Sequence, residues 1–184
     1  MYTPALQQYQ VAEMPSAQPV PQPQDKPKAP AKSKAGSDVG AFIQQLIGLS
    51  AYIKELETQS HLIHLNYEGS NFLGVHAFLK DQYEAHLEQF DTIGEFVRSM
   101  DYLMPLCNCG LKDMMPPMQE IKSYKGTDML GVYYKNLEDL GMQAKKLEGM
   151  AQKVHAIDIQ NYMAELVGQA FKAAWFVKAT LRNG

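Results

Sequence analysis

The chain has 184 residues, of which 46% are hydrophobic and 20% charged, with a formal net charge of −3. These values describe a soluble globular protein of one domain plus a tail and exclude a fibrous or wholly disordered chain. No apolar run reaches the roughly 18 residues that a membrane-spanning helix needs, and residues 1–10 lack the basic and apolar regions of a signal peptide. We therefore expect a cytoplasmic protein with no membrane partner.

Residues 1–37 differ in composition from the rest of the chain, because they hold seven of the ten prolines and almost no periodic apolar residues. Such a segment cannot bury enough apolar surface to offset its ordering entropy. We expect a disordered tail over residues 1–37, followed by one domain over residues 38–184.

The second half of this tail is basic. Lysines on a mobile tail bind nucleic acid by releasing counterions from phosphates, and many tails on one oligomer raise the avidity. The alternative is a solubilising tail that binds nothing. The candidate nucleic-acid-binding residues are Lys26, Lys28, Lys32 and Lys34.

Apolar residues recur at helical spacing after Asp38, a candidate N-cap, and predict a first long helix. Its expected inward residues are Phe42, Leu46, Leu49, Ile53, Leu56 and Ile63. The break over residues 68–71 reverses the chain, because glycine tolerates positive φ and Asn71 can cap the next helix. We expect a second long helix from Phe72 to about Tyr102, antiparallel to the first.

Residues 103–126 contain three prolines and two glycines, which predicts a connection with one short helix near Met118–Tyr124. A third long helix is expected over Thr127–His155. Asp158 is the expected cap of a fourth, which buries Trp175 among other apolar residues. Four long helices with a long crossover between the second and third indicate an all-α fold, the ferritin-like four-helix bundle.

The two cysteines, Cys107 and Cys109, are separated by one residue. This spacing is poor for an ordinary structural disulfide, so we interpret them as two free thiols in a loop. The alternative is a soft-metal site, for example for Cu(I), with the methionines that follow. Those methionines are Met114, Met115 and Met118.

Residues 64–95 concentrate side chains that bind metals. His76 and Lys80 are four residues apart, as are Asp91 and Glu95, so each pair projects from one face of a helix. His76 and Asp91 lie fifteen residues apart, about 22 Å along a straight helix, which is too far for one metal site. Either the pairs are unrelated, or a second copy of the chain brings its Asp91 and Glu95 to His64 and His76.

This stretch resembles the Dps proteins (DNA-binding proteins from starved cells), a dodecameric branch of the ferritin-like superfamily. The matching residues are His64, Gly69-Ser70-Asn71-Phe72, His76, Asp91 and Glu95. A weaker similarity follows at Ile121–Tyr124 and at Trp175. The resemblance implies a homo-dodecamer in which the two histidines and two carboxylates are catalytic ferroxidase ligands, contributed by two subunits across a two-fold interface. A mixed nitrogen and oxygen ligand set suits Fe(II).

The implied activity is oxidation of Fe(II) by peroxide or oxygen, followed by storage of iron in a hollow shell. The family also protects DNA from oxidative damage, and a DNA-bound protein would be associated with the nucleoid.

Two residues depart from the family pattern: Lys80 stands in place of an aspartate, and Leu65 in place of a usual tryptophan. The pattern implies that the first iron takes His64, Asp91 and Glu95. The second keeps only His76 and a shared Glu95. Two alternatives therefore remain: a structural or DNA-compacting shell with impaired oxidation, and a helical-bundle adaptor that binds no metal.

Six other ionisable residues lie outside the pattern shared with the Dps proteins. We expect structural roles for three histidines: His61, His86 and His155. We expect a solvated helix surface for three acids, with conduction or nucleation of iron as the alternative: Asp81, Glu84 and Glu88.

Overall fold

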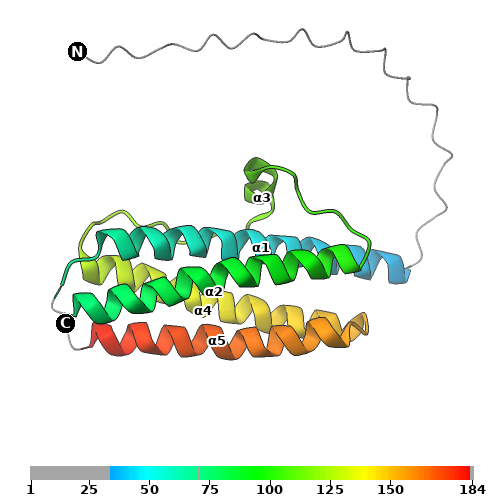
Figure 1. The fold of residues 1–184 in the computed structure, drawn as a ribbon. Helices are drawn as coiled ribbons and strands as arrows, with labels where there is room; N and C mark the ends of the chain where they lie inside the picture. The colour runs from blue at the N-terminus through cyan, green and yellow to red at the C-terminus, as the bar shows by residue number, and fades with distance from the viewer. Residues whose placement is uncertain (1–33, 70, 183–184) are drawn as a thin grey trace, which may run out of the picture. The chain divides into compact units, whose positions relative to one another are not determined.

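The computed structural model describes residues 34–69 and 71–182, with side chains from Asp38 onward. Its helices are α1 (Lys34–Asn66), α2 (Phe72–Ser99), α3 (Asn108–Met114), α4 (Gly126–Lys153) and α5 (Ile157–Leu181). No strand occurs in those two ranges, and the expected all-α class is confirmed (Figure 1).

The long helices form two antiparallel hairpins, α1 with α2 and α4 with α5, which join through contacts between α1 and α4. The short helix α3 belongs to the crossover from α2 to α4 and packs against α1. This arrangement confirms the expected ferritin-like bundle with its crossover between the second and third long helices.

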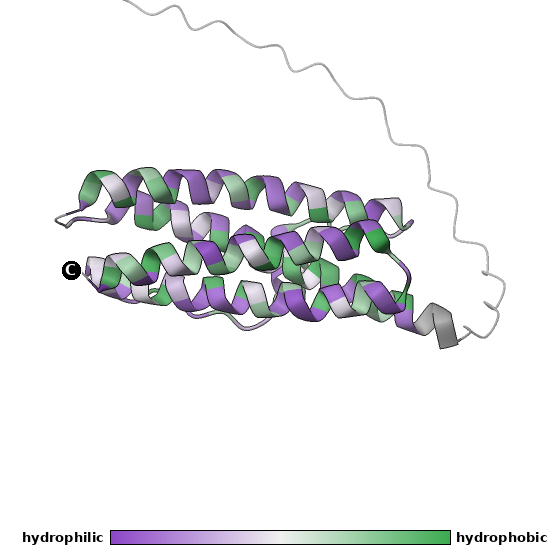
Figure 2. Ribbon diagram, turned by 90° about the horizontal axis from the view of Figure 1, so that it is seen from below, coloured by the Kyte–Doolittle hydropathy of each residue, from purple (hydrophilic) through white to green (hydrophobic). Residues whose placement is uncertain are grey.

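Apolar side chains at helical spacing fill the interior, and Figure 2 shows hydrophobic and hydrophilic residues alternating along each long helix. Burying one large aliphatic side chain stabilises the fold by about 1.5–3 kcal/mol. All six residues expected to face inward from α1 are buried. The expectation for Trp175 is wrong, because its side chain is 61% exposed. It lies two residues from both Ala173 and Val177, which are buried, and therefore points to the opposite side of α5.

The helix boundaries correct several expected caps. α1 begins at Lys34, four residues before Asp38. Asn71 does occupy the N-cap position of α2, but its side chain makes no capping hydrogen bond. Ala156 is the N-cap of α5 and Asp158 lies in the first turn. There its carboxylate still interacts favourably with the helix dipole.

The expected short helix over Met118–Tyr124 is wrong, since the only helix described in the crossover is α3. α3 ends before Pro116, as expected because a residue that precedes proline disfavours the α conformation. The following segment is held by Asn136 of α4. The N–H of Gln119 donates to Asn136 Oδ1 at 3.1 Å, and Asn136 Nδ2 donates to the Gln119 carbonyl at 2.9 Å.

Cys107 and Cys109 form a disulfide, so the interpretation as free thiols is wrong. The turn into α3 brings their Cα atoms to 5.3 Å, within the range that a disulfide spans. The bonded sulfurs also lack the thiolate character that a Cu(I) site needs.

Candidate metal centre

Two histidines face each other where the α1–α2 hairpin closes. His64 lies near the end of α1 and His76 near the start of α2, with ring centroids 3.6 Å apart and ring planes 20° apart. His64 Nδ1 bonds to the carbonyl oxygen of His76 at 2.9 Å, and His76 Nδ1 bonds to the carbonyl oxygen of His64 at 3.1 Å.

These reciprocal bonds define the protonation of both rings. A carbonyl oxygen only accepts, so each Nδ1 carries the proton and, in the neutral ring, each Nε2 carries a lone pair. Metal-binding histidines are commonly oriented in this way. Within the described part of the chain, neither Nε2 has a hydrogen-bond partner. The hairpin therefore presents two imidazole nitrogens ready to bind a metal.

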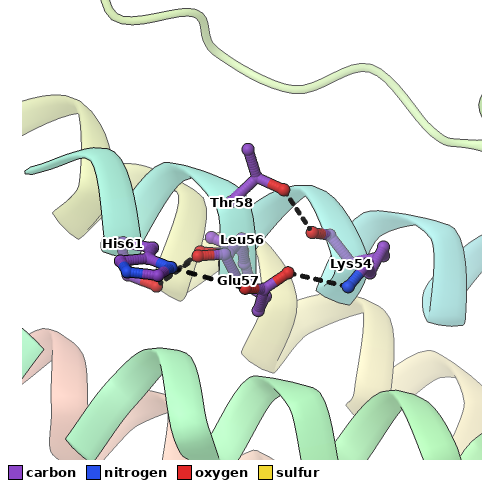
Figure 3. Close-up of polar contacts among 6 residues, drawn as sticks. Lys54, Leu56, Glu57, Thr58 and His61 are labelled. Atoms are coloured by element: carbon purple, nitrogen blue, oxygen red, sulfur yellow. Dashed lines mark hydrogen bonds and ion pairs between the residues drawn. The ribbon is translucent and has the colours of Figure 1, made fainter. Parts of the chain in front are cut away.

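Three further aromatic rings lie beside this pair, of which Phe72 stacks on His76 at 5.0 Å. Tyr83 of α2 meets His64 edge-on at 5.5 Å and stacks on His61 at 4.2 Å. Glu57 lies between Lys54, at 2.8 Å, and His61, at 3.9 Å (Figure 3). Tyr83 was not among the predicted site residues, although its position seven residues after His76 places it on the same face of α2.

The two expected carboxylate ligands lie elsewhere on α2. Asp91 and Glu95 are exposed, and Asp91 is about 22 Å from His76 along the helix. Among residues 34–69 and 71–182, no three histidine, cysteine or acidic side chains gather in a metal-binding arrangement. One copy of the chain thus brings His64 and His76 together but leaves the carboxylates apart from them.

Lys80 lies one helical turn after His76, with its side chain exposed and paired with Glu84. The hydrogen bond to Glu84 raises the pKa of Lys80. The ammonium is therefore charged at neutral pH and held along α2 by a residue of its own helix.

Exposed leucines occur on both helices of this hairpin. Leu65, next to His64 in α1, is 66% exposed, and Leu87 of α2 is 54% exposed. Leu87 shares its side of α2 with Asp91, four residues later.

The bundle interior contains a second polar cluster, which was not predicted from the sequence. The expected structural role of His86 agrees with its burial and with its bonds to Gln89 and Tyr133, both 2.9 Å long. Burial lowers the pKa of His86 to about 4 and raises the pKa of Tyr133 above its usual range.

The candidate nucleic-acid-binding lysines cannot be placed in the same way. Lys26, Lys28 and Lys32 lie outside the described residues, and Lys34 is described only as the first residue of α1. None of the described helices is long and apolar enough to cross a bilayer.

The fold and the histidine pair define a ferritin-like protein. A family model described as the ferritin-like domain matches residues 43–184. The chain therefore belongs to the ferritin-like family. No curated protein sequence matches it significantly.

Several solved structures, most of them Dps proteins, share this fold. Dps from Thermosynechococcus elongatus is 15% identical with a TM-score of 0.77, over 81% of this chain and 95% of that one. Dps from Vibrio cholerae O1, described as one of the ferritin-like diiron-carboxylate proteins, is 16% identical with a TM-score of 0.73, over 84% and 99%. A dodecameric thioferritin from Bacteroides fragilis is 10% identical with a TM-score of 0.74, over 79% and 86%. The resemblance to Dps proteins is thus confirmed in fold.

Proposed function

We propose that the protein is a Dps-like mini-ferritin. It binds and oxidises Fe(II) at sites between subunits, stores iron in a hollow shell and protects DNA from oxidative damage. The observation that carries this proposal is the His64–His76 pair, which offers two lone pairs, whereas no third metal-binding side chain of the described residues gathers with it.

A second copy of the chain supplies what the pair lacks. Asp91 and Glu95 are exposed and four residues apart, so both project from one face of α2. Two histidines and two carboxylates form a mixed shell that suits Fe(II) and leaves positions open for an oxidant. In a two-fold interface the same surfaces meet twice, so each pair of subunits forms two such sites. The dodecameric relative supports a closed shell of this kind.

Lys80 limits this chemistry. The first iron keeps His64, Asp91 and Glu95, whereas at the second an ammonium stands one turn from His76 and repels Fe(II). We infer one well-bound iron per site and slow oxidation. Lys80 also favours a second candidate, a structural or DNA-compacting shell with impaired oxidation.

We propose that any association with DNA is made by the tail, residues 1–37. A net charge of −3 disfavours phosphate at the surface of the shell, while residues 26–34 are locally basic. On this proposal the protein is cytoplasmic and associates with the nucleoid when it binds DNA.

Anaerobic titration with Fe(II) tests the proposed site. His64→Ala and Asp91→Asn should each abolish tight binding, although the two residues lie far apart in one subunit. Asp139→Asn, an exposed carboxylate on α4, is the matched control and should bind as the unaltered protein does. Undiminished binding by Asp91→Asn would exclude it as a ligand.

A further inference from the structure

The disulfide in the crossover between α2 and α4 closes a very short loop. Cys107 and Cys109 are separated by Asn108 alone, and their Cα atoms lie 5.3 Å apart. Both cysteines are exposed. The leucines that precede them are exposed as well, Leu103 at 77% and Leu106 at 104%. A thiol from solution can therefore approach the bond.

This disulfide does little to hold the fold together. A cross-link stabilises a protein mainly by restricting the unfolded chain, and the effect grows with the length of the loop that it closes. A bridge across one residue restricts little and joins no two helices. The crossover is held instead by the packing of α3 on α1 and by the hydrogen bonds between Gln119 and Asn136. Exposed disulfides without a structural task are typically labile, regulatory or catalytic.

The sulfur of Cys107 has a hydrogen-bond donor of its own. The N–H of Gly110 donates to Cys107 Sγ at 3.2 Å. This close approach of the backbone depends on glycine, because a Cβ at Gly110 would lie 3.1 Å from the Cβ of Pro105. A hydrogen bond to an ionised acceptor is stronger than one to a neutral acceptor. The loop thus stabilises Cys107 as a thiolate more than as a bonded sulfur.

The sulfur of Cys109 lacks such support. Within residues 71–182, no hydrogen bond reaches Cys109 Sγ. Lys112 and Asp113 follow three and four residues later on the same side of α3, and both are exposed. Their opposite charges largely cancel at Cys109. Negative charge is therefore held better on Cys107 than on Cys109.

We propose that Cys107 and Cys109 form a redox-active pair that exchanges electrons with thiols, in which Cys109 is the sulfur attacked and Cys107 is the thiolate that leaves. The direction follows from the environments of the two sulfurs, since the more stable thiolate leaves faster in thiol–disulfide exchange. This activity is separate from the candidate metal centre and needs no iron.

Atoms and electrons balance over two exchanges. A donor thiolate attacks Cys109 Sγ, the bond between the cysteines breaks, and Cys107 leaves as a thiolate that later takes a proton. A second donor thiolate attacks the donor sulfur of the mixed disulfide, forms the donor disulfide and releases Cys109 as a thiolate. Two electrons pass from the donor to the pair. The reverse sequence, with a donor disulfide, restores the bond.

The first test equilibrates the full-length assembled protein with mixtures of reduced and oxidised glutathione in the absence of oxygen. Acid quenches the exchange, and the free thiols are alkylated and counted by mass spectrometry. The pair should convert fully between disulfide and dithiol as the glutathione ratio changes. A second arm replaces glutathione by thioredoxin. Faster reduction at equal concentration identifies a protein dithiol as the donor, and slower reduction identifies a small thiol.

A variant with both Cys107→Ser and Cys109→Ser separates redox chemistry from structure. Serine is also a good N-cap residue, so α3 is preserved. The variant should unfold at nearly the same temperature as the oxidised protein. A pair that stays oxidised in excess reduced glutathione, or a large fall in the unfolding temperature of the variant, would identify a structural disulfide and overturn the inference.

The single variants test which sulfur leaves. The chain has no other cysteine, so Cys109→Ser retains only the thiol of Cys107, and Cys107→Ser only that of Cys109. Since the thiolate is the reactive form, iodoacetamide at pH 7 should alkylate Cys107 several-fold faster than Cys109 in the folded protein. The difference should disappear in urea, where the bond from Gly110 is lost. Equal rates in the folded protein would overturn the assignment of Cys107 as the leaving group, whatever the result of the iron titration.

Discussion

The histidines His64 and His76 become a candidate site through the backbone of the opposite helix. Each Nδ1 bonds to the carbonyl of the other histidine, so closing the hairpin fixes both tautomers at once. Ring orientation is therefore set before a metal binds, which reduces the ordering entropy that binding costs. The same closure brings Tyr83 and His61 against the pair.

Replacing Lys80 should restore the second iron. Lys80→Asp removes the ammonium next to His76 and adds a carboxylate one turn away on the same face. We expect bound Fe(II) to rise toward two per site and oxidation to accelerate, as measured by anaerobic titration and stopped-flow absorbance. Lys80→Ala removes only the charge and should give a smaller gain. Two tight irons and fast oxidation in the unaltered protein would show that Lys80 does not obstruct the site.

His86 should make the fold sensitive to mild acid. Its pKa is about 4 in the folded chain and about 6.5 when unfolded. The unfolded state therefore binds more protons between these values, and stability is lost as pH falls from about 6.5 to 4. At pH 5 the free energy of unfolding should be about 2 kcal/mol lower than at pH 8 on this account.

Urea unfolding of the iron-free protein at both pH values measures this difference. His86→Gln does not titrate, so its stability should depend less on pH. If the variant lost as much stability as the unaltered protein, other groups would cause the loss.

At the scale of helices, the docking of α3 depends on a glycine in α1. A Cβ added at Gly48 would lie 2.9 Å from the carbonyl oxygen of Met114, at the end of α3. Gly48→Ala should therefore destabilise the fold by about 1–3 kcal/mol through overpacking, although alanine is the better helix former.

Gly131→Ala is the matched control, because beyond the adjoining backbone of α4 no described atom lies within 4 Å of the added Cβ. It should stabilise α4 by about 0.5–1 kcal/mol. Thermal unfolding of both variants measures the contrast. Similar gains in the two would show that the Met114 backbone moves aside at little cost.

The four long helices were predictable from the sequence because their apolar residues repeat with the helical period. The crossover was not, because Asn136, seventeen residues after Gln119, holds the segment that follows α3. The pairing of His64 with His76 was implied by the resemblance to Dps proteins and agrees with the expected antiparallel hairpin. The role of Asp91 and Glu95 as ligands remains a prediction, because within one chain neither residue contacts His64 or His76. The Tyr133–His86 pair joins residues 47 positions apart, and no local pattern signals it.

For the whole molecule, DNA binding should depend on the tail. Replacing Lys26, Lys28, Lys32 and Lys34 together by alanine keeps the length of the chain but removes its basic run. Binding at low salt should be abolished, as measured by gel shift, because few counterions are then released from the phosphates. Replacing four lysines of the helical body instead, Lys135, Lys145, Lys146 and Lys153, is the control and should preserve binding. Equal binding by both variants would assign the DNA contact to neither set.

The central claim is that a second copy of the chain completes the metal site, and mixed assemblies test it most directly. One variant carries His64→Ala and His76→Ala, and the other carries Asp91→Asn and Glu95→Gln. Each alone should form a shell of about twelve subunits by ultracentrifugation and should not oxidise Fe(II). When the two are refolded together, half of the two-fold pairs are mixed, and each mixed pair regains one of its two sites.

Fe(II) oxidation by the mixed shells should therefore recover to about a quarter of the rate of the unaltered protein. If shells shown to contain both variants recover no oxidation, the histidines and carboxylates do not meet between subunits.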